Sequence, residues 1–209
     1  MKRELPRHAG NFLASYAQDA RRRWTREDRA EQQAFVHHRL CGRRWADWST
    51  ETAALALLQP GLVPAALAQG HEPDVVLLAG PLVELIDPLE LFRAAADHLA
   101  PGGVLVGIVP CLRDNSPESD LFARLTAEAF WPYFVAEELL ELLREAGFTP
   151  NPDCKFVPIP QFQHAALRRE LAFPGFGEVL GRLQAEGYDA HEVGWGELRL
   201  AASLDPSAE

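Results

Sequence analysis

The stretch Leu99–Pro110, LAPGGVLVGIVP, decides the fold class of this chain. Pro101 restricts φ and the Gly102-Gly103 pair tolerates positive φ, so the first half predicts a helix end followed by a tight reversal. Val104–Val109 is almost wholly apolar, which indicates a strand that is buried on both faces. Such strands are typical of parallel sheets flanked by helices, and these sheets usually bind a ligand at their carboxyl edge.

A second buried strand and a helix precede this stretch. Asp74–Leu78, DVVLL, has the same apolar character as Val104–Val109. Pro88 is expected to begin a helix that runs to Leu99 with its apolar residues on one face. Because neighbouring parallel strands need a crossover connection, residues 74–109 predict a strand, helix, strand unit.

The flanking segments extend this pattern into an α/β sandwich with a mostly parallel sheet. Downstream, helices are expected at Leu121–Ala129 and at Val135–Ala146, the second of which is ended by Gly147. A strand at a sheet edge is expected at Lys155–Ile159, and a last strand with alternating residues at Glu197–Ala202. Upstream, the patterns favour a helix at 10–34, a strand or helix end at Ala34–Leu40, a short strand at Arg44–Trp48 and an Ala/Leu-rich helix at Thr52–Leu58. Residues 111–120 are expected to form a polar loop, and 167–188 a mixed helical insertion.

Length and composition are those of a globular protein. The chain has 209 residues, of which 47% are hydrophobic and 24% charged. No apolar run is long enough to span a bilayer, and the first ten residues, MKRELPRHAG, lack the apolar core of a secretory signal. The three cysteines are odd in number and widely spaced, which indicates a reducing compartment. We therefore expect a cytoplasmic protein without membrane association.

Charge is distributed unevenly along the chain. Residues 1–45 hold 11 Lys/Arg against 5 Asp/Glu, whereas the net charge of the whole chain is −10. This favours a basic helical amino-terminal arm at 1–43 and an acidic α/β domain at 44–209 with an insertion at about 161–196. Arg21–Arg23 fits a solvated helix face, and nucleic-acid binding is the less favoured alternative because the chain is acidic and carries no nucleic-acid motif.

The order of these elements resembles that of class I S-adenosylmethionine-dependent methyltransferases. The matching pieces are Asp74-Val75-Val76, Asp87-Pro88, the Leu99–Gly103 reversal, the strand Val104–Val109 and the helix Glu137–Phe148 with its Ala-Gly-Phe ending. The resemblance implies a Rossmann-like methyltransferase sandwich. In this sandwich the last strand, ELRLAA, is antiparallel to the others.

The glycine loop of the family is not found in this chain. In that family the first strand ends in a loop with an acidic residue before G-x-G, where the backbone approaches the methionine part of the cofactor. Upstream of Asp74 the glycines are Gly10, Gly42, Gly61 and Gly70, and no two of them lie within three residues. HAGNFLASYA resembles the end of such a loop, so the first strand is either lost or replaced by another segment.

The resemblance also implies candidate cofactor-binding residues. RWADWSTETAALAL is similar to the second strand of the family with its acid and helix, which would make Asp47 the acceptor for the ribose hydroxyls and place Trp48 beside the adenine. The alternative is that Asp47 and Ser49 only cap the next helix. Gly80, Pro81 and Leu82, after the DVVLL strand, would line the methionine part and the methyl acceptor.

For the other residues with reactive or metal-binding side chains, the favoured interpretation is a structural role. His164 and His191 could serve as a base but fit surface positions, and Cys111 fits a packed thiol. His37, His38 and Cys41 have helical spacing but no further ligand, so no metal site is predicted. The cluster Phe130, Trp131, Tyr133 and Phe134 fits core or lid packing, with an aromatic acceptor pocket as the alternative. The spacing of Gly175, Gly177 and Gly181 is similar to that of a glycine loop, but these residues fit a turn and the start of a helix.

Two functions are compatible with these patterns. One is an enzyme that transfers a methyl group from S-adenosylmethionine to a small molecule or a macromolecule. The other is a non-catalytic relative that acts as a scaffold or partner subunit. A homo-oligomer and a hetero-oligomer both remain compatible with the sequence.

Overall fold

The structure is a computed structural model, and it describes residues 26–48, 72–79, 87–128, 133–158 and 175–205. Its strands are β1 (Trp45–Asp47), β2 (Val75–Ala79), β3 (Val104–Leu112), β4 (Phe148–Pro150), β5 (Lys155–Pro158) and β6 (Trp195–Leu204). Its helices are α2 (Arg26–Leu40), α4 (Pro88–His98), α5 (Pro117–Glu128), α6 (Ala136–Glu145) and α8 (Phe176–Ala185).

The six strands of the described residues form one sheet in the order β1-β2-β3-β6-β4, with β5 also paired to β6. β1, β2 and β3 are parallel, whereas β6 is antiparallel to β3, β4 and β5. Five of these six strands therefore run in one direction, and β6, the last in the chain, runs against them. This confirms the expected mostly parallel sheet with an antiparallel last strand.

The strand, helix, strand unit at 74–109 is present as expected. Val75 pairs with Val104 and Ala79 with Ile108, in parallel register, and α4 connects the two strands. Pro88 occupies the first turn of α4, and the Asp87 carboxylate accepts a hydrogen bond from the Leu89 N–H at 2.8 Å. This cap fixes the start of the crossover helix.

The reversal before β3 uses its two glycines differently. Gly102 has a φ of +72°, in the left-handed region that favours glycine. Gly103 has no positive φ, but a Cβ there would lie 2.7 Å from the Ala100 carbonyl oxygen. Only the first glycine therefore supplies the positive φ, while the second permits close approach of the backbone.

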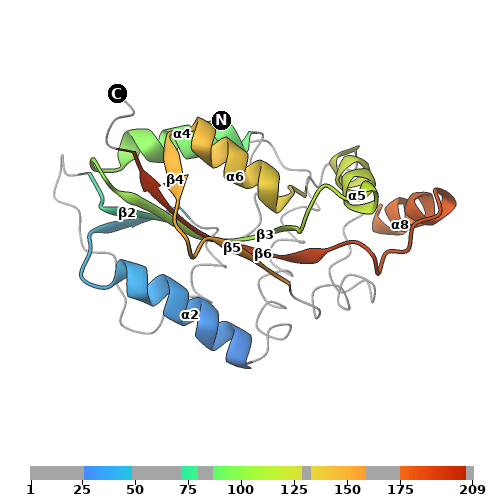
Figure 1. Cartoon of the computed structure of the whole chain (residues 1–209), viewed down its shortest axis with the longest axis horizontal. Helices are drawn as coiled ribbons and strands as arrows, with labels where there is room; N and C mark the ends of the chain where they lie inside the picture. The colour runs from blue at the N-terminus through green and yellow to red at the C-terminus, as the bar shows by residue number, and fades with distance from the viewer. Residues whose placement is uncertain (1–25, 49–71, 80–86, 129–132, 159–174, 206–209) are drawn as a thin grey trace.

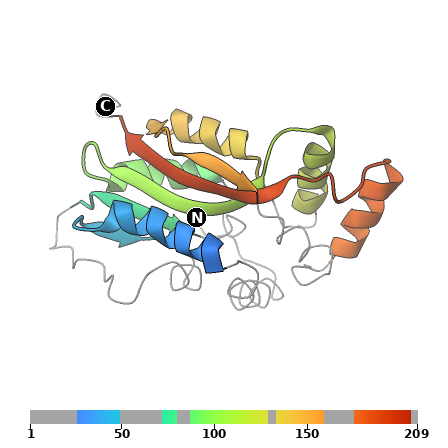
Figure 2. The ribbon, with the colours of Figure 1, turned by 60° about the horizontal axis from the view of Figure 1, so that its bottom comes forward.

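Helices cover both faces of the sheet (Figure 1). On one face α4 and α6 bury a cluster around Phe92, Leu139 and Leu143. On the other face α2 packs Val36 and Leu40 into a cluster that includes alternate residues of β2 and β3. The turned view shows α2 below the sheet and α5 and α8 beyond the far end of β3 and β6 (Figure 2). The described part of the amino-terminal region thus shares a core with the sheet; the division into arm and domain stays a prediction.

Several predicted boundaries were wrong. β3 continues beyond the predicted end at Val109 to Leu112, because its last residues pair with β6. The predicted polar loop at 111–120 therefore shrinks, and α5 already starts at Pro117. Of the two alternatives for Ala34–Leu40, the helix end is confirmed, since α2 ends at Leu40. The early part of the helix predicted at 10–34 and the helix at Thr52–Leu58 lie outside the described residues.

Candidate functional site

The carboxyl ends of the parallel strands β1 and β2 form the candidate site. In doubly wound sheets of order 3-2-1-4-5-6 the first strand lies beside the fourth, and ligands bind beyond the carboxyl ends of these strands. Trp45 pairs with Val75 and Asp47 with Leu77, so β1 lies beside the DVVLL strand. β1 is therefore the direct neighbour of β2 among the described strands. The interpretation of this segment as the second strand of the family stays a prediction.

Asp47 is the last residue of β1 and is exposed. The chain continues along β2 for one more residue, because the Trp48 N–H donates to the Leu77 carbonyl oxygen at 2.8 Å. An exposed carboxylate at the end of this strand can accept hydrogen bonds from two neighbouring hydroxyl groups. The alternative that Asp47 and Ser49 only cap the next helix concerns residues 49–58, which lie outside the described residues.

Trp48 packs against α4. Its ring centroid lies 5.4 Å from that of His98 with an interplanar angle of 32°, and its half-buried side chain contacts the apolar cluster below α4. The structure thus gives Trp48 a packing role. Its contact with an adenine ring stays a prediction.

Gly80, Pro81 and Leu82 lie outside the described residues. Their place in the chain is fixed, because they follow Ala79, the last residue of β2, which is buried. Gly42 is the glycine nearest to β1 in the chain, with a φ of +74° in the turn that enters this strand. Since Gly42 precedes β1, it cannot replace a glycine loop that follows the strand. The residues described here fit a ribose through Asp47, but they supply no glycine for the loop.

Most other sequence candidates have structural roles. Tyr133 packs edge-on against Trp195, with ring centroids 5.4 Å apart, which confirms core packing for this member of the aromatic cluster. Phe134 packs against the cluster under α6. Phe130, Trp131 and His164 lie outside the described residues.

Gly175 begins α8 with a φ of +92°, and a Cβ at Gly177 or Gly181 would meet nothing within 4 Å. The turn and helix start predicted there are confirmed. His191 is exposed in the turn before β6. Within the described ranges, no group of three or more His, Cys, Asp or Glu lies together in a way that could hold a metal ion.

Cys111 is buried, and desolvation raises the pKa of its thiol well above the ordinary value. The thiolate is the nucleophilic form of cysteine. The interpretation of Cys111 as a packed thiol is therefore confirmed.

A buried polar network between α2 and β6 was missed. Gln32 Nε2 donates to Glu197 Oε2 at 2.6 Å, and Arg199 Nε donates to Glu197 Oε1 at 3.1 Å. Arg199 also donates to the Glu31 carboxylate at 3.1 Å. The available signal was the alternation of Glu197 and Arg199 with two leucines in the last strand, which places both charged side chains on one face.

The sheet order, the crossover helix and the antiparallel last strand define a Rossmann-like methyltransferase sandwich. Residues 9–151 match a family model described as "Methyltransferase domain". The chain belongs to this family. No curated protein matches the chain.

One solved structure shows the same fold, and a second is similar over part of the chain. A putative methyltransferase from Bacillus halodurans C-125 is 14% identical, with a TM-score of 0.53 over 86% of this chain and 99% of that chain. A putative sarcosine dimethylglycine methyltransferase from Galdieria sulphuraria is 17% identical, with a TM-score of 0.43 over 65% of this chain. The chain spans only 54% of the length of the Galdieria protein. Within the described residues, no helix has the length and apolar character needed to cross a membrane.

Proposed function

We propose that this chain is an S-adenosylmethionine-dependent methyltransferase that binds the cofactor beyond the carboxyl ends of β1 and β2. The observation that carries the proposal is the parallel pairing of β1 with β2, which brings the exposed Asp47 beside the strand that leads into Gly80. Membership of the methyltransferase family supports it. The acceptor is a small molecule or a side group of a macromolecule.

The residues of the site would bind and orient the cofactor. When bound, S-adenosylmethionine supplies a methyl group on a positively charged sulfur. Asp47 would accept hydrogen bonds from the ribose hydroxyls, and Gly80, Pro81 and Leu82 would line the methionine part. Trp48, held by His98, would form a side wall beside the adenine. Methyl transfer is an in-line displacement, so most of the catalysis comes from positioning the two reactants.

A scaffold without catalysis is the second candidate. The observation in its favour is the absence of paired glycines after β1: the segment that follows Asp47 reads WSTE. Glycine permits the close approach of a cofactor to the backbone, which Ser, Thr and Glu hinder. A relative with this segment would keep the fold for assembly with itself or with an active partner.

Calorimetric titration with S-adenosylhomocysteine separates the two functions. The enzyme hypothesis predicts binding, with an affinity at least tenfold weaker in Asp47→Ala, because a carboxylate bonded to hydroxyls contributes about 1.5–3 kcal/mol. Asp205→Ala is the matched control, since Asp205 is an exposed aspartate after β6 at the opposite edge of the sheet, where Ser203 pairs with Val104, the first residue of β3. Absence of heat with the wild-type protein would favour the scaffold. Equal affinities of the wild type and Asp47→Ala would remove Asp47 from the site.

The cytoplasmic location also stays a proposal. It is supported by the cysteines, since Cys41, Cys111 and Cys154 are all free.

A further inference from the structure

Gln32 occupies a position where an apolar residue would be expected. The buried side of α2 consists of Gln32, Val36 and Leu40, spaced four residues apart and exposed by no more than 1% each. Val36 and Leu40 pack into the apolar core, whereas Gln32 faces the charged residues of β6. The interface between α2 and the sheet is thus apolar at one end of the helix and polar toward the other.

The polar end of this interface lies at the carboxyl edge of the sheet. Arg199 and Ala79 both pair with Ile108, so Arg199 is level with the last residue of β2. Glu197 pairs with Pro110, two residues further along β3, which places it roughly 7 Å beyond the end of β2. The network of Gln32 and Glu197 therefore borders the edge where the cofactor is proposed to bind.

One atom of Gln32 lacks a partner among the described residues. Gln32 Nε2 donates to Glu197, but the carbonyl oxygen of the same side chain, Oε1, is buried without a hydrogen-bond partner. The amide cannot be reversed, because Oε1 would then face a carboxylate oxygen. Buried acceptors in native proteins are nearly always satisfied, so Gln32 Oε1 requires a donor that the described residues do not supply, either a buried water or a bound group.

The charges nearby favour a cationic donor. The network contains two carboxylates, Glu31 and Glu197, and one guanidinium, Arg199, which is bonded to both. An ammonium group could donate a hydrogen bond to Gln32 Oε1 and would be attracted by the Glu31 and Glu197 carboxylates, whereas these carboxylates would repel a phosphate or a carboxylate.

We propose that Gln32 and Glu197 form a subsite that binds a primary or secondary amine as its ammonium ion, which would be the acceptor group for the proposed methyl transfer. For the transfer, the ammonium ion would first give one proton to the Glu197 carboxylate. The lone pair of the nitrogen would then form the new N–C bond as the C–S bond of S-adenosylmethionine breaks and S-adenosylhomocysteine leaves. The identification of the amine as a methyl acceptor rests on the proposed function. Entry of the amine requires separation of α2 from β6 at the Gln32 end, because Gln32 is closed to solvent. Such an opening would break the hydrogen bonds that Gln32 and Glu31 make to β6, while the other end of α2 stays held by Val36, Leu40 and an ion pair between Arg39 and Asp153.

Nuclear magnetic resonance of the whole, isotope-labelled chain tests this subsite with n-butylamine as the probe. The side-chain amide signal of Gln32 is expected to shift with saturating n-butylamine at constant pH. Tetramethylammonium, which has the charge but no N–H, is expected to bind at least tenfold more weakly. Gln32→Leu should weaken n-butylamine at least tenfold, whereas Gln33→Leu, on the same helix and only partly buried, should not.

The outcomes decide between the subsite and its alternatives. Equal binding of both cations would contradict a role for the N–H donor. No shift of the Gln32 signal, or equal affinity in Gln32→Leu, would overturn the subsite and leave the oxygen to a buried water. The comparison of n-butylamine with tetramethylammonium uses only the wild-type protein, so it tests the subsite even where a variant fails to fold. Titration of the same samples with S-adenosylhomocysteine shows separately whether the proposed function fails.

Discussion

Gly107 of β3 lies directly against the main chain of Leu78 in β2. A Cβ built at Gly107 would be 2.5 Å from the Leu78 carbonyl oxygen, closer than real Cβ atoms approach another atom. These two residues lie opposite each other in the parallel pairing of β2 and β3. The close approach of β3 to β2, one of the two strands that carry the candidate site, thus depends on a residue without a side chain.

Gly107→Ala should therefore destabilise the protein. The added methyl group forces the two backbones apart in the centre of the sheet, and overpacking of this kind costs about 1–3 kcal/mol. Urea denaturation followed by circular dichroism measures the loss in the free energy of unfolding. Gly181→Ala is the control: it lies within α8, meets nothing within 4 Å and should be neutral or stabilising by about 0.5–1 kcal/mol. Equal effects of the two substitutions would contradict the close approach.

Asp74 should make stability depend on pH. Hydrogen bonds from Arg44, at 2.6 Å and 3.0 Å, hold the pKa of the Asp74 carboxyl below its ordinary value of 3.8. A lowered pKa stabilises the folded state above the ordinary pKa, and this contribution is lost as the pH falls through the folded-state pKa. The difference in melting temperature between the wild type and Asp74→Asn should be constant from pH 7 to roughly pH 5 and should shrink below pH 4. A difference that does not change down to pH 3 would contradict the ion pair.

The three cysteines should differ in reactivity. Cys41 is exposed, while burial raises the pKa of the Cys111 and Cys154 thiols. Because the thiolate is the reactive form, iodoacetamide should label Cys41 first, Cys154 slowly and Cys111 only after unfolding. Peptide mass spectrometry over time measures the order. Labelling of Cys111 in the folded protein at the rate of Cys41 would show that β3 is not buried as described.

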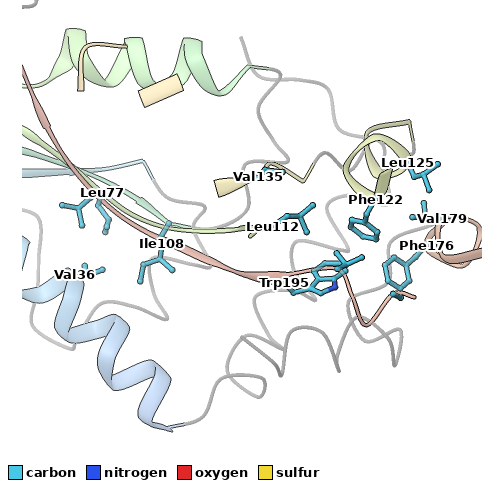
Figure 3. Close-up of a cluster of buried hydrophobic side chains, with 14 of the residues drawn as sticks. Val36, Leu77, Ile108, Leu112, Phe122, Leu125, Val135, Phe176, Val179 and Trp195 are labelled. Carbon is cyan, nitrogen blue, oxygen red and sulfur yellow. The ribbon is translucent and has the colours of Figure 1, made fainter. Parts of the chain in front are cut away.

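Phe122 should be essential for the apolar cluster around Trp195. Its ring lies edge-on to Trp195, with centroids 4.8 Å apart, and its side chain is fully buried (Figure 3). Phe122→Ala should lower the free energy of unfolding by about 3–5 kcal/mol, and the near-ultraviolet circular dichroism of the tryptophan should change. Leu121→Ala, at a partly buried neighbour, should cost clearly less. Equal losses would contradict the packing shown for Phe122.

The central unit of the fold could be predicted because its signals are local. The apolar runs of β2 and β3, the Asp87-Pro88 helix start and the glycine reversal each occupy a few neighbouring residues. The extension of β3 to Leu112 could not be predicted in this way, because it depends on pairing with Trp195, which is distant in the chain. The pairing of Trp45–Asp47 with β2 could not be predicted for the same reason, since the neighbour of a short strand is set by the whole sheet.

The candidate site was predicted only in part. Asp47 could be selected from the resemblance of its segment to the second strand of the family, and the structure places it at the end of β1 beside β2. Gln32 was missed because helical periodicity predicts an apolar residue at its position, and a glutamine there indicates an exposed face. Its burial follows from the charged pair Glu197 and Arg199 on a strand that is distant in sequence.

The most direct test of the account is amide hydrogen exchange of the whole chain with and without S-adenosylhomocysteine. The cofactor is expected to slow exchange at Ala46–Trp48 and at the carboxyl end of β2, Leu77–Ala79, while the far edge formed by β4 and β5 is unchanged. Exchange that is identical with and without S-adenosylhomocysteine, or slowed only away from β1 and β2, would contradict a cofactor site at this edge of the sheet.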